Sequence, residues 1–234
     1  MKLLLPLWKL FCFGLSAMIA AFFLYQFWFF IQILYWVEHN PVTTRFMDMR
    51  LVTLREKNTH SRLEQQWVGY GTISVHLKRA IIIAEDAKFI EHDGFDWEGI
   101  RKAMEKNQMR GKVVAGGSTI TQQLAKNLFL SNERSALRKG EEAIIAAMLE
   151  AVMAKRRIFE LYLNYAEWGE SVFGVEAAAR HYFGVDTASL TPEQAARLAA
   201  MLPRPRYYDR NPGSPYLAIY TESIFARMPS AQIP

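Results

Sequence analysis

The feature that most constrains this chain is an uncharged stretch near its N-terminus. Residues 10–37 (LFCFGLSAMIAAFFLYQFWFFIQILYWV) contain no Lys, Arg, Asp or Glu. A stretch of this length can cross the ~30 Å hydrocarbon core of a bilayer as a helix, even when tilted. We therefore predict that residues 1–37 form a short cytoplasmic tip and one transmembrane anchor.

The charges that flank this stretch predict its orientation. Lys2 and Lys9 precede it, and Glu38 and His39 follow it. Basic residues on the N-terminal side favour a cytoplasmic N-terminus, which places the rest of the chain across the membrane. A cleaved signal peptide is the alternative, since residues 16–21 offer small side chains for a cut. The apolar run continues well past them, which favours a retained anchor. Plausible interface anchors are Trp8, Trp28, Tyr35 and Trp36.

Composition limits the chemistry of the remaining chain. The 234 residues fit one domain plus an appendage. The only cysteine, Cys12, lies in the predicted anchor, which excludes disulfides, thiol catalysis and thiolate metal sites from the domain. The net charge of +5 suits an anionic membrane surface or a phosphate-bearing ligand. The sequence has no basic cluster interleaved with aromatic residues, so it does not indicate nucleic acid as a partner.

Beyond the anchor, the pattern predicts a mainly α fold. Residues 38–64 are interpreted as a juxtamembrane segment and residues 65–234 as the domain. Cap and breaker signals predict helices over 76–88, 97–109, 118–129, 135–154, 155–164 and 174–184, one starting after Thr191, and one over 216–228. Residues 202–215 are expected to be loop, and strand signals are limited to 51–54 and 68–73.

Glu85 is the first candidate for chemistry. It follows an apolar turn, residues 80–84, so its carboxyl should be desolvated and its pKa raised. A carboxylate tuned upward suits a general base for a sugar hydroxyl. The alternative is a structural pair with Lys88, which the segment alone favours. His92 could also be a base, but it ranks below Glu85.

The segment GGSTITQQLAKN (116–127) is the second candidate. Its glycines free the backbone before a helix, and Ser118 and Thr119 place hydroxyls and amides at a helix N-terminus that favours an anion. Gln122, Gln123 and Lys126 follow on the next turns. This polar face suits a ligand with hydroxyls, amides and negative charge, such as an amino sugar on a phosphate. A capped helix with a solvated face is the alternative, but it does not account for the neutral glutamine pair.

A third group of candidates lies in residues 132–164. Arg134, Arg138 and Lys139 form a basic group, and Arg138 is four residues from Glu142, the spacing of a surface ion pair. Spacing alone leaves Glu141 and Glu142 as alternatives. Residues 155–157 (KRR) are interpreted as a solvated basic face.

The order of these segments resembles the peptidoglycan glycosyltransferases, the family 51 enzymes. The first block matches the motif Glu-Asp-x-x-Phe-x-x-His-x-Gly, and the second matches Gly-x-Ser-Thr-Ile-Thr-Gln-Gln-x-x-Lys-Asn from Gly116 to Asn127. The third matches Arg-Lys-x-x-Glu-Ala and selects Glu142. The resemblance covers roughly residues 65–205. It is weakest at 101–115. No Ser-x-x-Lys or Lys-Thr-Gly transpeptidase motif occurs, so we expect a monofunctional enzyme.

The resemblance implies a lysozyme-like, two-lobed α-helical domain that polymerises lipid II on the periplasmic side of the bacterial inner membrane. It implies Glu85 as the base and Glu142 as a second catalytic carboxylate that orients cations or helps to hold Mg²⁺ or Mn²⁺ with the diphosphate. It also implies two sets of further residues. The substrate and diphosphate set is Ser118, Thr119, Gln122, Gln123, Lys126, Asn127, Arg134, Arg138 and Lys139, and the supporting set is Asp86, Phe89, His92 and Gly94.

The resemblance also indicates partners and rivals. The expected partners are lipid II, the growing glycan strand, the membrane and unidentified proteins of cell-wall synthesis or division. An apolar membrane-facing patch is expected from Trp97, Ile100, Met104, Met109, Val113 and Val114. The first rival is a lytic transglycosylase or hydrolase of peptidoglycan, which needs a buried Glu but no cation cluster. The second is an inactive scaffold, against which the intact motifs argue.

Overall fold

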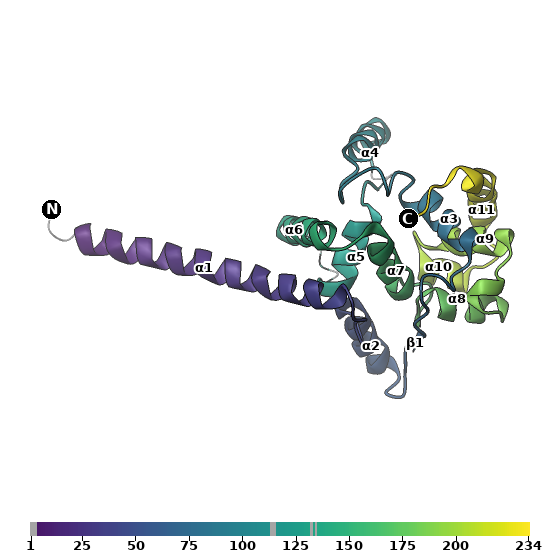
Figure 1. The fold of residues 1–234 in the computed structure, drawn as a ribbon, viewed down its shortest axis with the longest axis horizontal. Coiled ribbons are helices and arrows are strands. Elements are labelled where there is room, and N and C mark those ends of the chain that lie inside the picture. Colours follow the sequence, from purple (N-terminus) through teal and green to yellow (C-terminus); the bar gives the residue numbers. More distant parts are fainter. Residues whose placement is uncertain (1–3, 113–115, 132, 134) are drawn as a thin grey trace. The chain divides into compact units, whose positions relative to one another are not determined.

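The computed structural model describes residues 4–112, 116–131, 133 and 135–234, and its chain falls into two compact units. The first unit, Met1–Asn40, consists mainly of the long helix α1 (Leu4–Trp36). Its section Trp8–Trp36 is long and apolar enough to cross a membrane, as the uncharged stretch predicts. Figure 1 shows this helix in purple.

The second unit, Pro41–Pro234, is mainly helical, which confirms the mainly α prediction. Two short strands, β1 (Glu64–Gln65) and β2 (Val172–Phe173), pair in parallel. The helices are α2 (Arg45–Lys57), α3 (Val75–Glu85), α4 (Trp97–Arg110), α5 (Ile120–Phe129), α6 (Ala136–Val152), α7 (Lys155–Tyr165), α8 (Val175–Phe183), α9 (Pro192–Met201), α10 (Pro205–Arg210) and α11 (Pro215–Arg227), with 3-10 turns at Thr187–Ser189 and Met228–Ser230.

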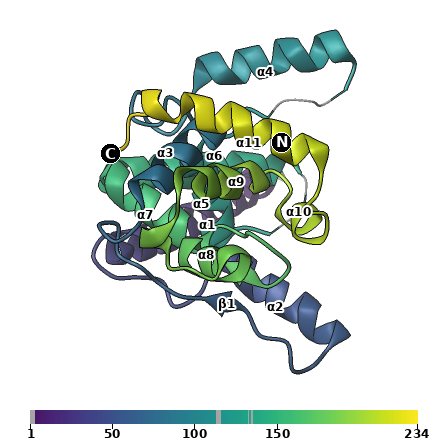
Figure 2. The ribbon, with the colours of Figure 1, turned by 90° about the vertical axis from the view of Figure 1, so that its right-hand side faces the viewer.

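The core of this unit is organised around α5 and α9. Helix α5 packs against α2, α6 and α7, while α9 packs against α3 and α11 (Figure 2). On α5, the predicted apolar stripe of Ile120, Leu124 and Leu128 is buried. Each such side chain contributes about 1.5–3 kcal/mol on burial. The opposite face of α5 is thereby left for the polar residues of the same segment.

The predicted helix starts are confirmed by capping hydrogen bonds. The side chains of Ser74, Asp96 and Ser135 each accept a bond from a backbone N–H in the first turn of α3, α4 and α6. Thr191 and Gln194 form the predicted capping box on α9. These interactions span only one turn, so the local sequence is sufficient to specify them.

Both strand predictions are wrong. Residues 51–54 lie inside α2, whose N-cap Thr44 accepts a bond from the backbone of Met47 and whose Leu54 is buried. Residues 68–73 form no strand, because the Val68 backbone bonds instead to the Asn164 side chain. The second unit thus begins at Pro41 and includes α2, although the sequence places the domain boundary at residue 65.

Three further expectations are corrected. Helix α3 ends at Glu85 instead of residue 88, and residues 202–215 contain the short helix α10. Residues 155–157 are only partly a solvated face, because Arg156 is exposed while Lys155 and Arg157 are half-buried. Lys155 pairs with Glu150 at 2.8 Å, and Arg157 pairs with Glu160 at 2.7 Å. These partners lie on the same or neighbouring helices and hold Lys155 and Arg157 against the protein.

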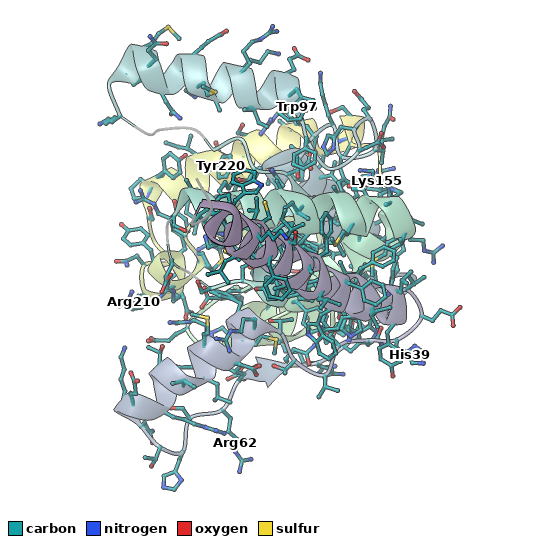
Figure 3. All side chains as sticks on the ribbon, turned by 90° about the vertical axis from the view of Figure 1, so that its left-hand side faces the viewer. His39, Arg62, Trp97, Lys155, Arg210 and Tyr220 are labelled. Atoms are coloured by element: carbon teal, nitrogen blue, oxygen red, sulfur yellow. The ribbon has the colours of Figure 1, made fainter. Side chains whose placement is uncertain are left out.

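Helix α4 lies at the edge of the second unit (Figures 1 and 2), and three of its large apolar side chains face solvent, whereas Ile100 is half-buried. Ala103 is its only buried residue. Trp97, which is labelled in Figure 3, Met104 and Met109 are 73%, 66% and 79% exposed. Val113 and Val114, also expected in this patch, lie outside the described residues. Exposed apolar residues gathered on one helix are typical of an interaction surface.

Candidate active site

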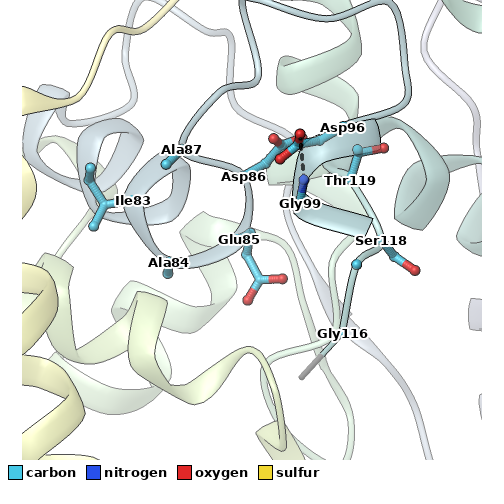
Figure 4. Close-up of a pocket in the computed structure, with 11 residues that line it drawn as sticks. Ile83, Ala84, Glu85, Asp86, Ala87, Asp96, Gly99, Gly116, Ser118 and Thr119 are labelled. Atoms are coloured by element: carbon cyan, nitrogen blue, oxygen red, sulfur yellow. Dashed lines mark hydrogen bonds between the residues drawn. The ribbon is translucent and has the colours of Figure 1, made fainter. Parts of the chain in front are cut away.

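Glu85 is the last residue of α3 and lines a small pocket of about 150 Å³. The opposite wall comes from Asp96 and Gly99 of the α4 start and from residues 116–119 (Figure 4). The expected pair with Lys88 is absent, since Lys88 bonds to Glu98 at 2.5 Å. Glu85 Oε2 instead accepts a hydrogen bond from Gln123 Nε2 at 2.7 Å.

The electrostatic surroundings raise the pKa of Glu85 above its ordinary value. Burial at the end of an apolar helix is the main cause, because it disfavours the charged form. The hydrogen bond from Gln123 and the charge of Lys126 act in the opposite direction, and the neighbouring Asp86 carboxylate adds to the rise. The carboxyl is thus tuned upward, as the apolar turn before it predicts.

Asp86 connects the first motif to the second. Its Oδ1 lies 2.9 Å from His92 Nε2, and its Oδ2 accepts a bond from the Ile120 backbone N–H at 3.0 Å. The Thr119 hydroxyl donates to the Gly94 carbonyl at 2.7 Å. The two sequence blocks are therefore joined at the N-terminus of α5, which fixes Gln123 opposite Glu85.

The N-terminus of α5 is satisfied by the protein's own groups. Gln122 accepts from the Thr119 backbone N–H at 3.1 Å, and the Thr119 side chain accepts from the Gln122 N–H at 3.2 Å. With Asp86 as the anion at this helix end, the structure gives Gln122 and Thr119 a capping role. It does not aim the Gln122 side chain, which is buried, at a ligand.

The remaining residues of the first motif, Phe89 and Gly94, support the site structurally. Phe89 is fully buried, with its ring centroid 5.7 Å from that of Phe159 and 4.6 Å from Lys155 Nζ. Gly94 has a φ of +86°, a backbone conformation that favours glycine. A Cβ at this position would also meet Glu150 Cγ at 3.0 Å.

A larger cleft of about 620 Å³ adjoins this pocket and is lined by cations. Ser118 lines both cavities, and its hydroxyl accepts a bond from Lys139 Nζ at 3.1 Å. The walls of the cleft include Gln123, Lys126 and Asn127 of α5, and Arg138, Lys139 and Glu142 of α6. The structure thus brings together most of the predicted binding residues, while Arg134 lies outside the described residues.

Glu142 is 3% exposed, and both its oxygens are engaged by cations. Arg138 Nη1 lies 2.9 Å from Oε2, and Lys139 Nζ contacts Oε1. Ion pairs to a buried carboxylate restrict both cationic side chains. This geometry makes Glu142 an anchor for the two cations on the wall of the cleft.

Lys126 differs from its cationic neighbours. It is half-buried in the cleft and forms no hydrogen bond or ion pair with the residues that the structure describes. Burial lowers its pKa most strongly, the Glu142 charge raises it, and the charges of Arg138 and Lys139 lower it. A desolvated ammonium without a protein partner is suited to bind an anionic ligand.

The sequence missed three residues that line the same cleft. Glu167 lies 2.9 Å from Arg50 and 3.6 Å from Arg206, and Tyr162 is buried behind Gln123. The three lining residues, Tyr162, Glu167 and Arg206, come from α7, the segment after it and α10, so no local spacing joins them.

Comparisons with known proteins agree with this geometry. Residues 52–228 match the family model described as transglycosylase. The chain is 58% identical over 227 residues to the biosynthetic peptidoglycan transglycosylase of Nitrosospira multiformis, covering 97% of each chain. It is 60% identical over 220 residues to the protein of that name from Dechloromonas aromatica, covering 94% of this chain and 95% of the relative.

Proposed function

The chain belongs to the transglycosylase family, and from this premise we propose how its two adjoining cavities polymerise lipid II. The chain is a peptidoglycan glycosyltransferase that makes glycan strands. In the proposal, the growing strand is the glycosyl donor and lipid II is the acceptor. The observation that carries it is the placement of two groups near Gln123: a carboxyl with raised pKa that bonds to Gln123, and the Lys126 ammonium in the adjoining cleft, which has no hydrogen-bond or ion-pair partner among the described residues.

Glu85 acts as the general base in this proposal. It removes the proton from the 4-hydroxyl of the acceptor GlcNAc as that oxygen attacks C1 of the donor MurNAc. The bond from C1 to the undecaprenyl diphosphate breaks, and a β-1,4 linkage forms with inversion at C1. A raised pKa suits this step, since it brings the proton affinity of the carboxylate closer to what the transfer requires.

The cations of the cleft act on the leaving group. Negative charge grows on the diphosphate as the glycosidic bond breaks, so a fixed ammonium lowers the barrier. Lys126 supplies this charge directly, and Arg138 and Lys139 add to it from positions that Glu142 holds. Ser118 lines both cavities, Gln123 and Asn127 line the larger one, and all three side chains are suited to bind sugar hydroxyls and amides.

A divalent cation would be bound by the substrate in this proposal. In the described part of the chain, no three His, Cys, Asp or Glu side chains are grouped to hold a metal ion. The carboxylate of Glu142 is already engaged by two cations. Mg²⁺ or Mn²⁺ would therefore accompany the diphosphate oxygens, and the steps above use protein residues alone.

The anchor places the enzyme beside its substrate. Helix α1 can span a membrane, and lipid II is itself held in the bilayer by its undecaprenyl chain. Confinement to the same bilayer raises the effective concentration of each for the other. We place the N-terminus in the cytoplasm and the catalytic unit outside the inner membrane, on the basis of the flanking lysines.

The test is the purified full chain incubated with fluorescent lipid II in detergent. Long glycan products that lysozyme digests are expected. Cleavage of isolated cell wall without polymerisation would replace the proposal with a lytic enzyme, and the absence of both activities would indicate an inactive scaffold. Wild type and Glu85→Gln are compared under the same conditions to link the product to the proposed base.

A further inference from the structure

We propose that Tyr162 is a positioning residue for glycosyl transfer, whose phenol fixes the amide of Gln123 so that this amide donates to Glu85. The catalytic consequence rests on the proposed function, in which Glu85 is the base. Tyr162 does not bond to Glu85 directly. It acts on Glu85 only through the side chain of Gln123, which lies between them.

Three helices contribute one side chain each to this arrangement. Tyr162 Oη on α7 donates to Gln123 Oε1 on α5 at 3.2 Å, and Gln123 Nε2 donates to Glu85 Oε2 at the end of α3 at 2.7 Å. Tyr162 is 1% exposed and packed in the core, so its hydroxyl is held in place. The hydrogen-bonded chain therefore runs from the core to the pocket.

The direction of this chain follows from the groups that form it. An ionised carboxylate only accepts hydrogen bonds, whereas a glutamine amide has one donor end and one acceptor end. When the Tyr162 hydroxyl occupies the acceptor end of Gln123, the donor end faces Glu85. A flipped amide would present an oxygen to the carboxylate and leave the buried Tyr162 hydroxyl without its acceptor, which is unfavourable on both sides.

Other groups around Glu85 do not fix the orientation of the Gln123 amide as the Tyr162 hydroxyl does. Lys126 lies on α5 and Asp86 follows Glu85 in the chain, and both act on Glu85 by charge. Tyr220 on α11 donates its hydroxyl to the Ala84 carbonyl at 3.2 Å. Burial and the charges of Glu85 and Asp86 raise the pKa of Tyr162 well above its ordinary value, so its phenol stays protonated as a donor.

The consequence concerns the protonation of Glu85. The Gln123 bond lowers the pKa of Glu85 against the rise caused by burial. Without the Tyr162 hydroxyl, the amide is free to rotate and this bond weakens. The pKa of Glu85 then rises further, and a smaller fraction of the carboxyl is ionised at a given pH.

The test is Tyr162→Phe in the full chain, with kcat/KM for lipid II polymerisation measured against pH. The acidic limb of this pH–rate profile should move to higher pH by about 0.5–1 pH unit, as expected for the loss of one hydrogen bond. On that limb the rate should fall roughly 3–10-fold, and well above it the rate should approach wild type. A purely structural role would lower the rate equally at every pH, and that result would overturn the proposal.

Two comparisons isolate the hydroxyl. Tyr165→Phe removes a buried phenol from the same helix, but that hydroxyl donates to the Pro41 carbonyl, so the limb should not move. Gln123→Leu removes the amide and should move the limb upward by itself. Adding Tyr162→Phe to Gln123→Leu should then cause no further movement, and an equal second movement would contradict the proposed chain.

A direct titration separates this inference from the base assignment. The Glu85 carboxyl is followed by ¹³C NMR in protein with labelled glutamate side chains, with Glu85→Gln to assign its signal. Tyr162→Phe should raise the titration midpoint of that signal, and an unchanged midpoint overturns the inference. A raised midpoint with an unchanged rate profile would support the positioning of Gln123 and reject Glu85 as the base.

Discussion

Asp86 provides the sharpest test of how the site is held together. Its carboxylate is buried and bonds to two groups, His92 in the same motif at 2.9 Å and the Ile120 N–H, 34 residues further on, at 3.0 Å. The ring of His92 has no other partner among the described residues, because its Nδ1 is buried without a hydrogen bond. Asp86→Ala would therefore leave two buried donors unsatisfied.

The expected loss of stability follows from these two bonds. Loss of an acceptor at a helix N-terminus costs about 0.5–2 kcal/mol, and loss of a hydrogen bond to a charged group costs about 1.5–3 kcal/mol. We therefore expect Asp86→Ala to lower the free energy of unfolding by about 2–5 kcal/mol, a large part of the ~5–15 kcal/mol typical of a domain. Asp86→Asn retains one acceptor and should lose about half as much.

Urea unfolding of the full chain in detergent, followed by circular dichroism, measures this difference. Asp93→Ala is the matched control, because Asp93 is an exposed aspartate of the same segment, and surface changes of this kind usually stay within ±0.5 kcal/mol. If Asp86→Ala loses less than about 1 kcal/mol, or no more than Asp93→Ala, then Asp86 does not join the two motifs energetically.

Three further predictions concern the charged groups and α4. Glu85→Gln should reduce lipid II polymerisation by ~10²–10⁴-fold. Because burial raises the pKa of Glu85, the stability linked to its neutral form is complete below the ordinary carboxyl pKa of ~4.3 and is lost as pH rises. Glu85→Gln should thus be the more stable protein at pH 8 but not at pH 4, as measured by urea unfolding, and the opposite order would refute the desolvation argument. Lys126→Ala should reduce turnover by ~10–100-fold, with partial recovery in Lys126→Arg. Lys126→Ala should also weaken binding of the phosphoglycolipid moenomycin. Unchanged binding would show that Lys126 does not contact the diphosphate. Residues 41–234 should float with anionic vesicles, and Met104→Glu should prevent this while Val52→Glu, an exposed change on α2, should not.

The sequence predicted those parts of the fold whose causes are local. The caps at Ser74, Asp96 and Ser135 depend on bonds within one turn, and the stripe on α5 follows helical periodicity. The 51–54 strand prediction failed because a short β-branched run carries little information once a cap and a tertiary contact favour a helix.

In the candidate site, too, features with a local cause could be predicted from the sequence, and features that depend on tertiary packing could not. The rise in the Glu85 pKa could be predicted because its main cause, the apolar turn, precedes it in the chain. The role of Gln122 could also have been recognised, since Thr119 and Gln122 have the capping-box spacing. The Gln123 bond to Glu85 spans 38 residues, and the Arg50–Glu167 pair spans 117, so only the packing of the helices reveals them.

The neutral character of Gln123 has a physical reason in this arrangement. In the proposed mechanism Glu85 needs a partner that holds its orientation, but a cation at position 123 would lower the pKa of the carboxyl and weaken it as a base. A carboxylate there would raise the pKa so far that Glu85 would remain protonated, and it would also neutralise Lys126 in the adjoining cleft. A glutamine donates one hydrogen bond without a net charge. Glu85 can then act as the proposed base while Lys126, one turn further along the helix from Gln123, keeps its charge without an ion-pair partner among the described residues. The two opposite charges that the reaction requires can thus lie close together without neutralising each other.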